Sequence, residues 1–117
     1  MKQNKFTKPR PFAKNNTHPK NVDECIQSIL TWGKDLTGFK NKTEGAAVAE
    51  THHSVGLWIR NEWGLWKGSP LKDYFIQLGV THPDDMSGII IRCLHRHLNN
   101  KPLNLEEDVK RIKNLIV

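Results

Sequence analysis

Three tryptophans lie within nine residues of this chain, around an arginine and an asparagine. The segment runs from Trp58 to Trp66 with the sequence WIRNEWGLW. Indole rings bury a large apolar area, so the segment can belong to a core in which Arg60 and Asn61 satisfy neighbouring carbonyls. Tryptophan and arginine also dominate binding hot spots, and indoles stack on bases or cations. The segment therefore predicts either a packing centre or a recognition surface.

A second polar segment, residues 82–88, has the sequence HPDDMSG. The paired carboxylates of Asp84 and Asp85 can bind a divalent metal ion or divide the roles of acid and base. Aspartates are also common in the first turn of a helix, because they interact favourably with its positive end. A helix start is therefore the simpler interpretation of this segment.

Histidine and cysteine spacing gives little support for a metal site. The sequence has no His-x-x-x-His and no Cys-x-x-Cys pattern. Glu50 and His53 form one Glu-x-x-His pattern, but helical bundles that bind metals through this spacing need two copies. Cys25 and Cys93 fall on apolar helical stripes and are predicted to be buried thiols. We therefore assign no metal ligand and no other cofactor.

Basic side chains gather in two places. Arg92, His95 and Arg96 share one face of a predicted helix, where they either meet solvent or contact phosphates. The first 20 residues contain six lysines or arginines and no acid. The remaining 12 basic residues equal the acidic residues in number, so residues 21–117 are formally neutral. In this arm, the candidates for nucleic-acid contact are Lys2, Lys5, Lys8 and Arg10.

Helices must position these residues, because apolar side chains recur at the spacing i, i+3, i+4 and i+7 and never alternate for long. Capping residues mark the predicted helix starts at Asn21, Thr43, Ser69, Asp84 or Asp85, and Asn104. Small or amide residues mark the predicted ends at Gly33, after Trp63, at Gly79 and at Asn99. Residues 34–43 are predicted to form a loop.

The predicted fold is therefore all-α: a compact bundle of about five short helices over residues 21–117, behind a flexible basic arm of residues 1–20. Gly56 lies inside the second predicted helix, which indicates close approach by another element. His97 lies on the apolar stripe of the fourth predicted helix, so we expect a core histidine. The sequence contains no membrane span and no secretory signal, and we expect a cytoplasmic protein.

Taken together, the two polar segments resemble an uncharacterised family of small bacterial helical domains, a domain of unknown function. The resemblance is carried by WIRNEWGLW and HPDDMS with the nearby residues Ser69, Leu71, Phe75, Ile90 and His97. It runs from about Pro19 to the end of the chain. The resemblance implies no activity, but it directs attention to His53, Gly56, Arg60, Asn61, His82, Asp84 and Asp85.

Three functions remain open. The first is a small non-enzymatic module that binds a protein or a nucleic acid through the basic arm and a surface formed by Trp58, Arg60, Asn61 and Trp66. The second is a pocket for an anionic ligand or substrate, built from His53, Arg60, His82, Asp84 and Asp85. The third is a structural subunit with an oligomer interface. The sequence has no nucleotide-binding or hydrolase motif, so we favour the first and assign no catalytic residue.

Overall fold

The computed structural model describes residues 18–116, and their side chains as far as Asn114. These residues form helices and contain no strand, which confirms the all-α prediction. The helices are α2 (Val22–Leu30), α3 (Thr37–Asn41), α4 (Glu44–Thr51), α5 (Val55–Glu62), α6 (Pro70–Leu78), α7 (Pro83–Leu98) and α8 (Leu105–Ile116). The described part of the chain thus has seven helices, and the predicted number of about five is wrong. Residues 1–17 of the predicted arm lie outside the described residues.

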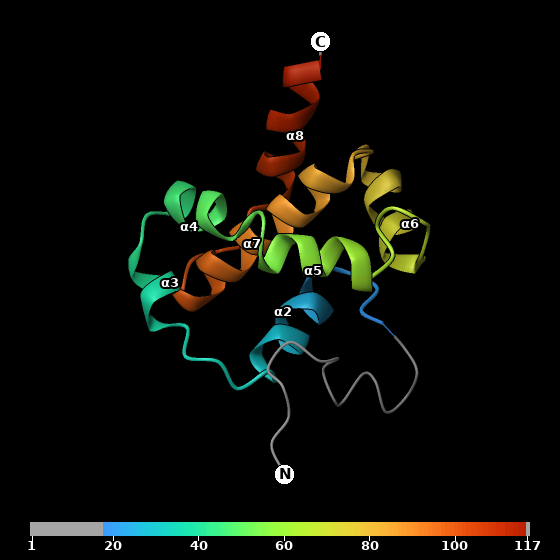
Figure 1. Ribbon diagram of the computed structural model, residues 1–117. Helices are drawn as coiled ribbons and strands as arrows, with labels where there is room; N and C mark the ends of the chain where they lie inside the picture. Colours follow the sequence, from blue (N-terminus) through green and yellow to red (C-terminus); the bar gives the residue numbers. More distant parts are fainter. Residues whose placement is uncertain (1–17, 117) are drawn as a thin grey trace.

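The central helix is α7, the longest at 16 residues. All the other described helices contact it, and Figure 1 shows α5 crossing in front of it while α8 projects from one side. A helix surrounded in this way is buried on more than one face. Ile89, Ile90 and Ile91 are consecutive, and each is at most 1% exposed.

The core around α7 comes from the apolar faces of the neighbouring helices. Residues buried with it include Ile26, Ile59, Leu71 and Phe75. Both cysteines are buried free thiols, as predicted. Burial raises the pKa of the Cys25 thiol well above its ordinary value, and raises that of Cys93 to about 12.

Several predicted helix starts are confirmed by side-chain caps. The side chains of Asn21, Thr43 and Ser69 accept hydrogen bonds from the backbone amides of Glu24, Ala46 and Lys72. Gly79 ends α6 with a left-handed φ of 95°, as a C-terminal glycine does. Asn104 precedes α8, but its φ of 52° is not the extended conformation of a capping residue.

The single helix predicted from Thr43 to Trp63 is in fact two helices, α4 and α5. The chain leaves the helical conformation between Thr51 and Val55, and Ser54 has φ −117° and ψ −87°. The Thr51 hydroxyl donates to the carbonyl of Ala47, 2.9 Å away. Threonine, histidine and serine have modest helix propensity, so a break at these residues loses little of the free energy that local helix formation provides. Each of the two shorter helices contacts α7.

Two further predictions are corrected. The loop predicted for residues 34–43 contains the short helix α3, where the ring of Phe39 packs 5.5 Å from that of His95. His97 is exposed, whereas His95 is buried at 5% exposure and its Nε2 lies 2.8 Å from the carbonyl oxygen of Lys42. The apolar stripe did not predict this, because α3 and α4 cover the neighbouring face of α7.

No helix within residues 18–116 combines the length and the apolar character needed to cross a membrane.

Candidate functional site

Arg60 is the buried centre of the segment that the sequence singles out, at 4% exposure. Its Nη1 donates to Ser87 Oγ on α7 at 2.8 Å, and its Nη2 donates to the carbonyl of His52 at 3.0 Å. Its Nε lies 3.4 Å from Asp84 Oδ1. All three nitrogens of the guanidinium thus contact α7 or the end of α4. A cation at this place also suits the negative C-terminal end of α4.

Gly56 lies one turn before Arg60 and gives the guanidinium its space. A Cβ atom at this position would lie 3.0 Å from Arg60 Nη1 and 3.3 Å from the carbonyl oxygen of Thr51. It would also lie 3.6 Å from Ile91 Cδ1 on α7. The expected close approach to Gly56 is therefore present.

His82 caps the N-terminus of α7, so the prediction that Asp84 or Asp85 opens this helix is wrong. The Nδ1 atom of His82 accepts a hydrogen bond from the Asp84 amide at 3.0 Å, and Pro83 takes the first helical position. Because Nδ1 accepts, the proton of the neutral ring is on Nε2. The ring of Trp66, which is 50% exposed, lies edge-on 5.8 Å from the His82 ring. Both aspartates lie in the first turn, where their charge suits the helix.

The structure brings together only part of the predicted anionic site. Arg60 and Asp84 meet, and His82 contacts Asp84 through the backbone. His53 is exposed, and its ring packs against His52 at 4.6 Å, while Glu50 pairs with Lys42 at 3.5 Å. Within residues 18–116, no three histidine, cysteine or acidic side chains are grouped as metal ligands.

The predicted phosphate-binding residues of α7 are held inside the fold. Arg96 donates to both carboxylate oxygens of Asp108, at 2.8 and 2.9 Å, and to both of Glu44, at 2.9 Å each. It also donates to the carbonyl of Leu103. Arg92 donates to Glu44 at 2.7 Å. These contacts join α4, α7 and α8 and engage all three nitrogens of the Arg96 guanidinium, whereas Arg92 takes part through Nη1.

The ion pairs of this cluster shift the pKa values of its members. Hydrogen bonds from Arg96, with a smaller contribution from Arg92, lower the pKa of Glu44 to about 2. The bond with Asp108 is the largest influence that raises the pKa of Arg96. Asp108 lies in the first turn of α8 and is only 2% exposed. No local pattern pairs it with Arg96, because the two residues lie on different helices.

The tryptophan-rich segment divides between the interior and the surface. Trp63 is 2% exposed, and its ring lies 5.6 Å from that of Trp58. Trp58 in turn lies edge-on to Trp32 at 4.9 Å. Trp66 is exposed on the loop between α5 and α6. The packing interpretation therefore fits Trp63, and the surface interpretation fits Trp66.

The outer face of α5 carries a hollow of about 350 Å³. It is lined by Ser54, Leu57, Trp58, Asn61 and Glu62. Leu57 is 46% exposed and lines this hollow together with Trp58. Neither Leu57 nor Glu62 was identified from the sequence, although helical spacing places Leu57 on the side of α5 away from the buried Ile59. Figure 1 shows this helix at the front of the molecule.

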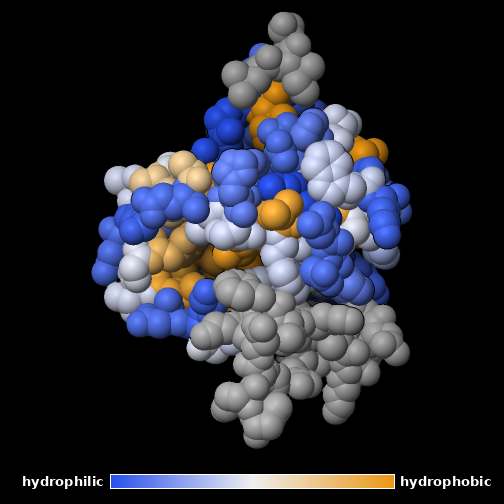
Figure 2. Space-filling model, viewed as in Figure 1, coloured by the Kyte–Doolittle hydropathy of each residue, from blue (hydrophilic) through white to orange (hydrophobic). Residues whose placement is uncertain are grey.

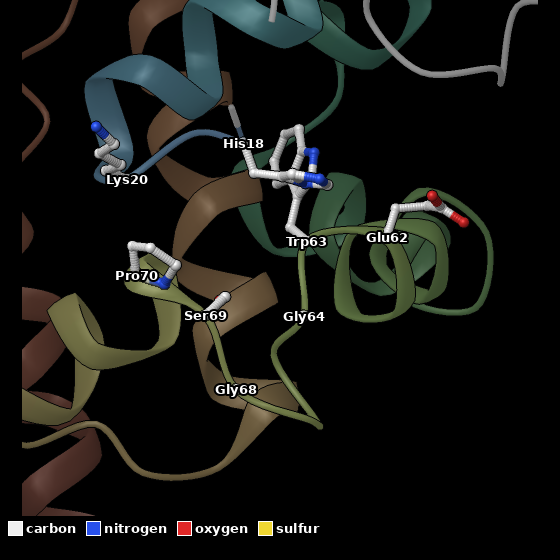
Figure 3. Close-up of a pocket in the computed structure, with 8 residues that line it drawn as sticks. All are labelled: His18, Lys20, Glu62, Trp63, Gly64, Gly68, Ser69 and Pro70. Atoms are coloured by element: carbon white, nitrogen blue, oxygen red, sulfur yellow. The ribbon is translucent and has the colours of Figure 1, made fainter. Parts of the chain in front are cut away.

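A second hollow of about 380 Å³ lies where α5 passes into the loop before α6. Figure 3 shows the His18 ring beside Trp63, with Glu62 extending away on the other side. The remaining wall comes from the loop and the start of α6, at Gly64, Gly68, Ser69 and Pro70, and Lys20 completes the lining. Glu62 borders both hollows, so the two lie next to each other.

Comparison with known proteins gives a family match. No curated protein and no solved structure is found to be similar. Residues 18–98 match a family of sequences described as a domain of unknown function, DUF6794. The match begins next to Pro19, as expected, but it ends at Leu98 rather than at the end of the chain. Because it spans more than half of the sequence, the chain belongs to this family.

Proposed function

We propose that this chain is a small protein-binding module, and that its contact surface is the outer face of α5 with the adjoining loop. The observation that carries the proposal is the exposed Leu57 beside two neighbouring hollows of about 350 and 380 Å³. Protein interfaces combine an apolar centre with a polar rim, and their hot spots are enriched in tryptophan. Trp58 and Leu57 would form the centre here, and Asn61 and Glu62 the rim.

A protein partner has more support than a nucleic acid among the described residues. Arg60, Arg92 and Arg96 donate to groups of the fold itself. Positive charge near the proposed surface comes from Lys20 and from the exposed Lys67 of the loop, and the acid Glu62 lies between the two hollows. The arm residues Lys2, Lys5, Lys8 and Arg10 lie outside the described residues. We propose that they speed association with an acidic partner, in which case high salt reduces the rate of binding.

The alternative of an anionic-substrate pocket has less support. It requires His53, Arg60, His82, Asp84 and Asp85 to converge in one cleft. Arg60 is instead 4% exposed and held by Ser87, Asp84 and a backbone carbonyl. None of these five residues lines either hollow.

Site-specific photo-crosslinking tests the proposal. A photoreactive amino acid replaces Asn61, which is exposed and lines the first hollow, and in a control protein it replaces Lys110, which is exposed on α8. In cells that naturally contain the protein, position 61 should crosslink to one other protein, and position 110 should not. Adding Leu57→Glu should reduce the crosslink about tenfold, the loss of about 1.4 kcal/mol expected for a moderate hot spot.

Three results would contradict this proposal. The first is an equal yield of the same product from positions 61 and 110. A product made of nucleic acid would assign the surface to the other class of partner. A product made of two copies of this chain would identify an oligomer interface instead.

A further inference from the structure

A third cavity, of about 140 Å³, lies between α2, α3, the turn from α4 to α5, and α7. It shares no lining residue with the two hollows of the proposed binding surface. Seven of its nine lining side chains are apolar, among them Ile29, Trp32, Phe39, Val55 and Ile91. Figure 2 shows apolar side chains gathered between α3, α4 and α5 on this face of the molecule.

The polar groups of this cavity do little to hold water. Thr51 and the exposed Lys34 line it, and the Thr51 hydroxyl already donates to the carbonyl of Ala47 within α4. The Nε1 atom of Trp32 is buried without a hydrogen-bond partner among the described residues, so it could offer a water molecule only one bond. A buried water needs two to four polar partners, and an apolar cavity of about 150 Å³ stays dry and accepts benzene. The size and the lining therefore favour an apolar guest over water.

We propose that this cavity is a binding site for a small, flat, uncharged molecule of about one aromatic ring. A cavity of about 140 Å³ is smaller than the roughly 300–1,000 Å³ of sites for drug-sized ligands. Trp32 and Phe39 supply ring faces and edges with which an aromatic guest can pack edge-to-face. Both are only partly buried, so the guest can enter along the edge of the cavity formed by the α2–α3 loop and α3.

Methyl NMR of the full chain tests this proposal with benzene as the probe. The δ1 methyl groups of Ile29 and Ile91 should shift in a saturable way, because an aromatic ring in the cavity displaces their resonances. The methyl group of Ile76, which is 42% exposed on α6, should not shift. Benzylammonium, which has the same ring with a charge, should bind at least about tenfold more weakly, since a charge is costly to bury.

A pair of variants locates the site. Val55→Phe places a ring in the cavity and should abolish the saturable shifts. Val109→Phe changes a partly buried valine on α8 that does not line the cavity, so benzene should bind this variant as it binds the wild type.

The wild-type titration decides the question even if Val55→Phe does not fold. Absence of saturable shifts at Ile29 and Ile91 up to the solubility of benzene would overturn the proposal. Equal shifts at Ile76 would do so too, because they would indicate non-specific association. A folded Val55→Phe protein that still binds benzene would place the guest elsewhere.

Discussion

The Nε atom of Arg60 lies 3.4 Å from Oδ1 of Asp84, and this ion pair joins the tryptophan-rich segment to the start of α7. The two partners differ in environment, since Arg60 is 4% exposed and the Asp84 side chain 47%. A half-exposed carboxylate compensates a buried cation only in part, and Ser87 and the His52 carbonyl supply the remaining hydrogen bonds. The two segments that carry the family resemblance are thus parts of one structural unit.

Replacing Arg60 should therefore damage the fold, whereas replacing its neighbour Asn61 should not. Arg60→Ala removes two hydrogen bonds of a buried charged group and leaves a void, at a cost of about 2–3 kcal/mol. The melting temperature should fall by about 10 °C. Asn61→Ala changes an exposed residue and should shift the melting temperature little. Thermal unfolding followed by circular dichroism measures both, and an unchanged melting temperature for Arg60→Ala would refute the structural role.

The two buried serines should respond to alanine substitution with opposite signs. Ser28 and Ser87 are both fully buried, but the Ser28 hydroxyl has no hydrogen-bond partner within the described residues. Ser28→Ala removes that unsatisfied group from a helix and should stabilise the protein by about 1 kcal/mol. Ser87→Ala leaves the Arg60 Nη1 donor unpaired and should destabilise it by about 1–3 kcal/mol. Urea unfolding of the two variants measures the sign of each change in the free energy of unfolding. Two decreases of similar size would contradict the prediction.

Acid should weaken the ion-pair cluster as the pH falls from about 4 to about 2. Arg96, followed by Arg92, holds the pKa of Glu44 at about 2 in the folded chain, below the value of about 4.3 in an unfolded one. A lowered folded-state pKa stabilises the fold fully above the unfolded value, and that stabilisation is lost as the pH falls through the folded value. Allowing for solvent screening at this partly exposed group, we expect about 1–2 kcal/mol.

The same prediction can be measured by comparing two glutamine variants across pH. The free energy of unfolding of Glu44→Gln should lie below that of the wild type at pH 6, and the difference should shrink towards pH 2. Glu50→Gln removes an exposed partner of Lys42 and should show no such convergence. If the Glu44→Gln difference is constant from pH 6 to pH 2, the assigned pKa is wrong.

Neither cysteine should react with thiol reagents while the chain is folded. Burial raises the pKa of Cys93 to about 12, so at neutral pH it has roughly three thousandfold less thiolate than a free cysteine of pKa about 8.5. Burial also raises the pKa of Cys25. Alkylation followed by mass spectrometry should detect almost no modification without denaturant and two modified residues in urea. Rapid single modification of the folded protein would contradict the described burial.

Much of the fold could be predicted because local chemistry determines it. Three helices begin at a residue whose side chain caps them, namely Asn21, Thr43 and Ser69, and α6 ends at Gly79 through its left-handed conformation. All four positions were identified from sequence. The start of α7 was missed at His82, although Pro83 gives the same proline signal as Pro70 does for α6. Histidine is simply an uncommon cap.

The remaining errors share a cause in tertiary contacts. The apolar spacing of Val48, Val55 and Ile59 is compatible with one helix, and the break between α4 and α5 is stabilised from elsewhere, by Arg60 donating to the His52 carbonyl. For the candidate site, the sequence identified Trp58 and Asn61 but not Leu57. An exposed leucine has no local signature, because its exposure depends on which helices leave it uncovered.

Asp108 has a consequence for where this domain ends. The family match stops at Leu98, yet Arg96 within it takes its second carboxylate from Asp108, and Ile112 of α8 belongs to the core. A chain that ends after Leu98 would therefore keep the sequence shared by the family but lose an ion pair and part of the hydrophobic core, and we expect it not to fold stably. Without α8, Arg96 would keep Glu44 as a carboxylate partner but would lose its hydrogen bonds to Asp108.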